Sequence, residues 1–223
     1  MLTGLLDNPV LTQAVPEATL ETLQMVGLSA LVTAVVGLPL GLLLHAVAPA
    51  GLRPLRLVRG PLGLLVNIGR SLPFIILAIA LLPFTRALVG TSLGWQAAVV
   101  PLSIGAIPFF ARLVETAVRE VDPGKVEAAQ VMGSSRGRVL VQVLVREALP
   151  SIVAGFTATV IALVAYSAMA GAIGGGGLGF LAISYGYQRF DTTVMVVCVV
   201  VIVLIVQAVQ VVGDVVARRL DHR

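Results

Sequence analysis

The segment TVMVVCVVVIVLIVQAVQVVG, residues 193–213, contains no charged side chain over its whole length. A helix needs about 20 consecutive, mainly apolar residues to cross a hydrocarbon layer of ~30 Å. The apolar residues of this segment run on without the alternation that marks a barrel strand, which favours a helix. The segment therefore predicts that the chain is an integral membrane protein.

The composition of the whole chain supports the same conclusion. Of its 223 residues 58% are hydrophobic and 12% are charged, and the mean hydropathy is +1.03. A soluble domain carries about 25% charged residues. The 15 basic and 11 acidic residues are too few to cover a soluble globule of 23.1 kDa.

Four other segments have the length and character of a membrane helix. The five expected spans cover residues 25–47, 62–84, 93–114, 150–171 and 193–213. The fold class expected is an all-α integral membrane protein with five transmembrane helices. We expect residues 1–223 to form one transmembrane domain, with residues 115–149 as a cytoplasmic segment.

The basic residues between the spans indicate the orientation of the chain. They gather in the segments 48–61 and 115–149 and in the C-terminal tail: Arg53, Arg56, Arg59, Arg119, Lys125, Arg136, Arg138, Arg146, Arg218, Arg219 and Arg223. The opposite side has only Arg86 and Arg189. Since cytoplasmic loops retain Lys and Arg, we expect the N-terminus outside and the C-terminus in the cytoplasm. An odd number of spans also requires the two termini to lie on opposite sides of the membrane.

Composition also excludes several classes of protein. A single cysteine cannot build a disulfide framework or a cysteine-based zinc site. The net charge is +4, but with 5% aromatic residues there are no basic patches interleaved with aromatics, so we expect no nucleic-acid partner. Residues 1–24 contain no Lys or Arg, and we expect no signal peptide. No cofactor and no metal site are predicted.

The spans also lack the ionisable groups of an embedded enzyme or an ion-coupled carrier. No Asp or Glu lies well inside a predicted span. His45 and Cys198 are interpreted as packing residues, and Asp214 as the i,i+4 partner of Arg218. Arg70 lies within the second span, where it either extends toward the cytoplasm or has a structural role in the interior.

Two nucleotide-binding patterns fail on context. Residues 174–179, GGGGLG, match G-x-G-x-x-G formally but follow a membrane helix rather than a strand, and we interpret them as a flexible extracellular turn. A P-loop requires G-x-x-x-x-G-K-[ST], yet the only lysine, Lys125, precedes Val126. If transport is driven by ATP, the nucleotide must bind another subunit.

The cytoplasmic segment carries the signals of a short helix. Asp122 can cap the free N–H groups, Pro123 suits the first helical position, KVEAAQVM follows, and Gly133 suits a left-handed stop. A second helix is expected over about 136–147, leading into the fourth span. The slim surface of Ala128 and Ala129 could enter the groove of another protein.

These residues carry a resemblance to a known family. EAAQVMG, residues 127–133, resembles the EAA motif by which binding-protein-dependent ABC importer permeases dock on their ATPase. The family pattern continues with Leu-Pro, where this chain has Val145 and Arg146. This departure affects the path that the cytoplasmic segment 115–149 is expected to take. The segments ETLQM (21–25), RSLPF (70–74), VGTSLGWQAAVVPLSIGA (89–106) and YSAMAGAIGGGGLG (166–179) look like the permeases of methionine ABC importers.

The resemblance implies a type I ABC importer permease in a bacterial inner membrane, itself not an enzyme. In that family two copies of the permease pair with two ATPase subunits and receive methionine from an extracytoplasmic binding protein, expected to be a lipoprotein. The residues that would couple the chain to the ATPase are Asp122, Lys125, Glu127, Ala128, Ala129, Met132 and Gly133.

The substrate path is expected in the outer half of the fourth span. Tyr166, Ser167, Ala168 and Met169 offer hydroxyl and thioether groups that could follow the substrate, although such a stripe is often packing. Arg70, Ser71 and Pro73 are candidates for a structural or gating role.

The hypothesis is alternating access in a homodimer. An ABC permease for another amino acid or small solute is the first alternative. An ion-coupled carrier or a membrane-embedded enzyme is the alternative from another class.

Overall fold

The computed structural model describes residues 9–49, 51–52 and 54–221, so Arg53 and Arg223 of the basic set lie outside the described residues. Within these residues every regular element is helical, as the sequence predicts. In chain order the elements are η1 (Val10–Ala14), α2 (Val15–Ala46), α3 (Arg56–Ser71), α4 (Phe74–Ala80), α5 (Leu82–Val89), α6 (Trp95–Arg119), α7 (Pro123–Val131), α8 (Arg136–Arg138), η2 (Val139–Leu144), α9 (Val145–Ala172), α10 (Gly177–Leu181), η3 (Ala182–Tyr187) and α11 (Thr192–Leu220).

Four helical runs of the described residues are long and apolar enough to cross a membrane. They are Val10–Ala46, Trp95–Arg119, Arg136–Ala172 and Thr192–Leu220. A fifth crossing is reached when Leu57–Ser71 and Phe74–Ala80 are taken together as one broken span. The structure thus agrees with the expected number of spans when this pair counts as one, and the helical run that contains the first span begins at Val10, earlier than expected.

The second expected span, residues 62–84, is not one helix. It is divided into α3, α4 and the start of α5, with a break at Leu72 and Pro73. Pro73 has φ −58° and ψ 131°, an extended conformation. A proline lacks the N–H that a helix interior needs, and it pushes the residue before it out of the helical region. The single helix expected here is therefore corrected to separate helices with a break at Pro73.

The fourth span is the last part of a longer helical run. The helix predicted over about 136–147 leads into the span as expected, because α8, η2 and α9 form one continuous helical run. Val145 and Arg146, which replace the Leu-Pro of the family pattern, lie inside this run. Arg146 keeps the backbone N–H that a proline would lack, so the run can pass through this position. Pro150 lies within α9, close to its start.

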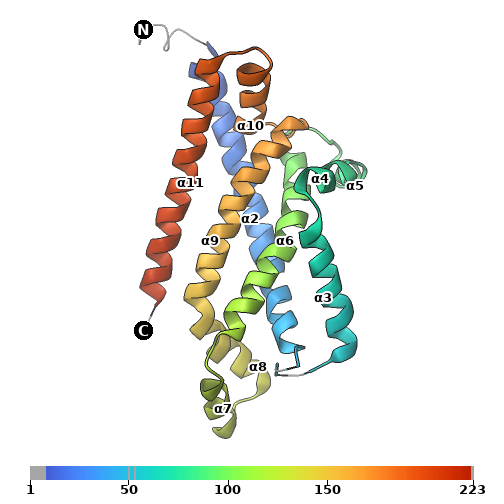
Figure 1. The fold of residues 1–223 in the computed structure, drawn as a ribbon, viewed down its shortest axis with the longest axis vertical. Coiled ribbons are helices and arrows are strands. Elements are labelled where there is room, and N and C mark those ends of the chain that lie inside the picture. The colour runs from blue at the N-terminus through green and yellow to red at the C-terminus, as the bar shows by residue number, and fades with distance from the viewer. Residues whose placement is uncertain (1–8, 50, 53, 222–223) are drawn as a thin grey trace. The chain divides into compact units, whose positions relative to one another are not determined.

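The helices contribute to two compact units, each with its own core. The first unit contains the described residues up to Leu31 together with Leu72–Gly105 and Val160–Gln210. Its core joins the beginning of α2 to α10 and α11 (Figure 1) through side chains that are almost completely buried: Val15, Ala18, Leu178, Leu181, Val194 and Cys198. Cys198 is thus a packing residue, as predicted.

The glycine-rich segment 174–179 belongs to this unit and is packed rather than flexible. Gly176 and Gly177 have φ of 74° and 72°, which favours glycine. The N–H of Gly177 donates to Oε2 of Glu21 at 2.7 Å, and the N–H of Leu178 donates to Oγ1 of Thr22 at 2.9 Å. Two side chains of α2 thus hold the start of α10, and the expected flexible turn is corrected to an anchored one.

The second unit contains Val32–Ser71, Ala106–Thr159 and the described residues from Val211. Its core consists of side chains from the end of α6, η2 and the start of α9. Glycines let other helices approach closely here. A Cβ on Gly41 of α2 would lie 2.5 Å from the carbonyl oxygen of Ala111, and one on Gly213 of α11 would lie 2.1 Å from Oγ1 of Thr157. The segment expected to be cytoplasmic folds as part of this unit.

Candidate functional site: coupling segment and substrate path

The short helix predicted in the cytoplasmic segment is α7, which follows α6 after a three-residue connection (Figure 1). Asp122 is its N-cap, and Oδ1 accepts from the N–H of Gly124 at 2.8 Å. Pro123 occupies the first helical position. At the other end Gly133 has φ 79°, and the N–H of Ser134 donates to the carbonyl of Ala129 at 3.0 Å. Both end signals of this helix are confirmed.

The faces of α7 differ from the expected arrangement at one residue. Glu127 and Ala128 are exposed, whereas Ala129 is buried against the chain itself. Both alanines were expected to form a slim exposed surface, but only Ala128 is exposed. Val131 and Met132 are 89% and 79% exposed at the end of the helix. Two large apolar side chains in this position form a surface that a partner could cover.

Lys125 connects α7 to the fourth span. Its Nζ lies 2.5 Å from Oε2 of Glu147 in α9. The two side chains are 49% and 37% exposed, so this pair contributes only about 0–1 kcal/mol to stability. The pair joins α7 to the first turn of α9.

The four residues of the candidate path fall into two groups. Tyr166 stacks on Phe74 at the start of α4, with ring centroids 4.8 Å apart and 5° between the planes. Met169, one turn further, is 38% exposed. Ser167 is 3% exposed and donates to the carbonyl of Val164 at 2.7 Å. Ser167 is therefore a packing residue, whereas Tyr166 and Met169 stay candidates for the path.

Ala168 belongs with the packing residues. A Cβ on Gly179 of α10 would lie 2.4 Å from the Cα of Ala168, so the two backbones are in close contact. Ala168 of the YSAMAG segment is therefore placed by its contact with the backbone of α10.

Arg70, Ser71 and Pro73 surround the break in the second span. Arg70 is exposed and lies in the last turn of α3, so its side chain is not inside the core of its own unit. Ser71 donates from Oγ to the carbonyl of Asn67 at 2.8 Å. The carbonyl of Pro73 accepts from the N–H of Ile76 at 3.0 Å, which starts α4. These residues define the end of one helix and the start of the next.

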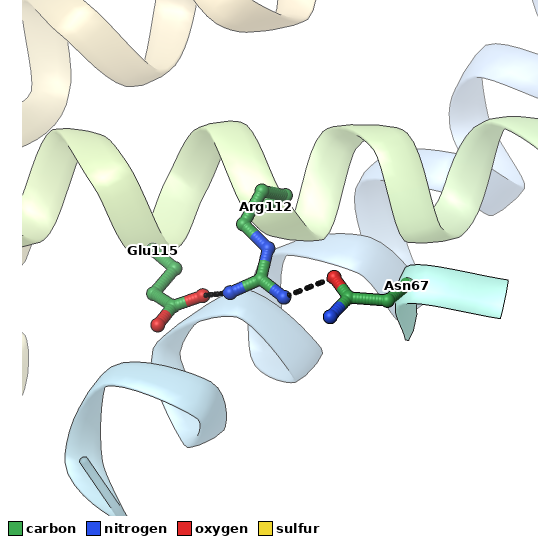
Figure 2. Close-up of polar contacts among 3 residues, drawn as sticks. All are labelled: Asn67, Arg112 and Glu115. Atoms are coloured by element: carbon green, nitrogen blue, oxygen red, sulfur yellow. Dashed lines mark hydrogen bonds and ion pairs between the residues drawn. The ribbon is translucent and has the colours of Figure 1, made fainter. Parts of the chain in front are cut away.

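A group of polar side chains that the sequence did not predict lies within the second unit. The guanidinium of Arg112 forms an ion pair with Glu115 and donates from Nη2 to Oδ1 of Asn67 at 2.7 Å (Figure 2). Glu115 is 3% exposed and lies inside α6, within the candidate span Trp95–Arg119, rather than at the start of a loop. Charged residues in membrane helices face protein or water and commonly mark function. The i,i+3 spacing of Arg112 and Glu115 was the available signal.

Two further observations concern ionisable groups. The Nε of Arg218 donates to the backbone carbonyl of Asp214 at 3.2 Å, a contact with the backbone that does not test the expected side-chain pair. Among residues 9–49, 51–52 and 54–221, the structure places no three His, Cys, Asp or Glu side chains together as metal ligands.

The chain matches a known protein family over most of its length. Residues 37–223 match the model of the family described as "Binding-protein-dependent transport system inner membrane component". The chain belongs to this family. It is accordingly a multi-pass component of the inner membrane and a permease component by family, with transmembrane helices as described above.

Two curated relatives and a solved structure are similar over almost the whole chain. A protein from Vibrio cholerae named "Probable D-methionine transport system permease protein MetI" is 50% identical over 92% of this chain and 92% of its own length. A protein of the same name from Pasteurella multocida is 47% identical, over 97% and 100%. An inward-facing structure of the MetNI methionine ABC transporter is 44% identical, with a TM-score of 0.90 over 93% of this chain and 96% of the other. The chain thus has the type I importer permease fold.

Proposed function

We propose that this chain is the membrane-spanning subunit of an ATP-driven importer that carries methionine, including D-methionine, into the cell. The names of the curated relatives and of the similar transporter support the substrate. The membrane helices and the family support the permease role. The chain itself would be non-catalytic, with ATP hydrolysed by a partner.

The partners proposed are two ABC ATPase subunits, a second copy of the chain and an extracytoplasmic methionine-binding protein, expected to be a lipoprotein. The similar structure is of an ABC transporter, which supports the ATPase as a partner. The absence of a P-loop in the sequence supports placing the nucleotide on that partner.

The observation that carries the proposal is the exposed end of α7. Val131 and Met132, in the second half of the EAA motif, are almost fully exposed, and Glu127 and Ala128 are exposed as well. The polypeptide between α6 and α7 is short, so a displacement of α7 would move α6 as well. A docked ATPase would therefore act on the membrane helices as rigid bodies.

Alternating access would occur in a homodimer, with Tyr166 and Met169 facing the path of each copy. Methionine carries no net charge as a zwitterion, so a path poor in fixed charges is compatible with it. Arg70, Ser71 and Pro73 would allow α4 to move as a separate segment from α3. We propose one transmembrane domain over residues 1–223, since α2, α6, α9 and α11 each contribute residues to both compact units.

Reconstitution tests this function. The chain is co-expressed with the ATPase and the binding protein proposed as its partners, and uptake of labelled L- and D-methionine is measured in vesicles with and without internal ATP. We expect uptake of methionine that requires ATP and the ATPase. Equal uptake of an unrelated amino acid would favour the permease for another solute. Uphill transport by the chain alone would refute the ABC mechanism and favour an ion-coupled carrier.

A further inference from the structure

An open cavity of about 520 Å³ in the second unit lies beside the polar group of Figure 2. Arg59 and Asn67 of α3 line it from one side, and Arg112 and Glu115 of α6 line it from the other. Two glycines of α3, Gly60 and Gly63, also line the cavity. The function proposed above assigns no role to this cavity.

The charges that line the cavity do not cancel. Glu115 is almost fully buried and forms an ion pair with Arg112, so the charge of Arg112 is compensated. Arg59 is half-buried and has no ion pair among the residues that the structure describes. The lining therefore carries one uncompensated positive charge. A zwitterion would leave this charge unchanged, whereas a phosphodiester, with one negative charge, would cancel it.

The cavity also has space for a phosphate beside the backbone of α3. A Cβ added to Gly60 or to Gly63 would meet no atom within 4 Å, so both glycines border open space. Guanidinium groups bind phosphate oxygens through paired N–H donors, and Asn67 adds an amide at the same rim. The site therefore combines charge, donors and room for an anion.

The residues around the cavity favour a lipid as its ligand rather than a soluble anion. The helix α3 begins in the basic segment 48–61, which is predicted to be cytoplasmic. Leu64 lines the cavity and is exposed, and Ile68, one turn further along the same helix, is exposed as well. Basic pockets between membrane helices on the cytoplasmic side bind the headgroups of anionic lipids. We propose that this cavity binds the phosphate of an anionic phospholipid, with its acyl chains along Leu64 and Ile68.

Native mass spectrometry of the purified full-length chain, in an equimolar mixture of phosphatidylglycerol and phosphatidylcholine, tests the proposal. We expect phosphatidylglycerol adducts to exceed phosphatidylcholine adducts. Arg59→Gln should weaken phosphatidylglycerol binding about fivefold, since one basic residue near an anionic lipid surface contributes about that factor. Arg219→Gln is the matched control, because Arg219 is an exposed basic residue at the predicted cytoplasmic end of α11 and does not line the cavity.

A steric variant keeps the test independent of charge. Gly63→Leu fills the cavity without meeting another atom at its Cβ, so the chain should fold and phosphatidylglycerol binding should fall. Equal binding of the two lipids, or an equal effect of Arg59→Gln and Arg219→Gln, would overturn the proposal. Displacement of the lipid by millimolar inorganic phosphate would assign the cavity to a soluble anion instead. A disulfide between two Gly63→Cys chains would show that a second copy covers it.

Discussion

Valine in place of Gly133 tests whether the end of α7 couples this chain to an ATPase. Gly133 has φ 79°, and a Cβ at this position would meet no atom within 4 Å. The cost of the substitution is therefore not a clash but the left-handed backbone itself, about 1–2 kcal/mol for a residue with a side chain. A β-branched residue adds stiffness at χ1. The end of α7 should change conformation while the rest of the chain stays folded.

The expected loss follows from that energy. A cost of 1–2 kcal/mol lowers the equilibrium constant for the docking-competent conformation by a factor of about 5–30, so the apparent affinity for the ATPase should fall by up to that factor. The assay is co-purification of the ATPase with the chain, together with ATP hydrolysis stimulated by the loaded binding protein in vesicles. Membrane insertion of the variant is verified separately, because the reasoning requires an intact membrane domain.

Gly137→Val is the matched control for this substitution. Gly137 lies four residues further along, a Cβ there also meets no atom within 4 Å, and its φ is not positive. Gly133→Asn provides a second control, because asparagine tolerates the left-handed conformation better than valine. We expect Gly133→Val to lose coupling, Gly137→Val to retain it and Gly133→Asn to lie between them. If Gly133→Val couples as well as Gly137→Val, the geometry of this helix end is not what the ATPase requires.

Three further predictions concern the membrane helices. Glu115→Ala leaves the guanidinium of Arg112 without its buried partner and should destabilise the chain by about 3 kcal/mol, seen as a lower unfolding temperature in detergent; an unchanged temperature would mean that the pair is energetically neutral. A small thiol reagent should label Met169→Cys in a manner that depends on substrate and nucleotide, but should not label Ser167→Cys, which is buried; equal labelling would place both on one surface. Gly213→Leu should destabilise by about 1–3 kcal/mol because its Cβ would overlap a threonine of α9, and wild-type thermal stability would contradict this close contact.

Local signals explain what could be predicted of the candidate site. Asp122, Pro123 and Gly133 act on the backbone within a few residues of themselves, so the bounds of α7 could be predicted from the sequence. Which side of α7 is buried could not be predicted, because Ala128 and Ala129 have the same side chain and differ only in what the folded chain places beside them. The path residues show the same limit, since the burial of Ser167 depends on the packing of α9.

The sequence by itself determined that the chain lies in a lipid bilayer, that its fold is all-helical and where most of its membrane helices are. Apolar transfer and backbone hydrogen bonding act on each segment separately, so a run such as 193–213 is sufficient to predict one helix. The break at Pro73 could not be predicted from the sequence, because a membrane helix can accommodate a proline or be interrupted by it.

Only the tertiary structure decided which polar groups meet. Arg112 reaches Asn67 across 45 positions of the chain, and Glu21 reaches Gly177 across 156. Such pairs depend on the registers at which separate helices pack, and no local pattern of residues specifies a register. The anchored glycine turn and the cavity beside Arg59 therefore exist as sites only in the folded chain.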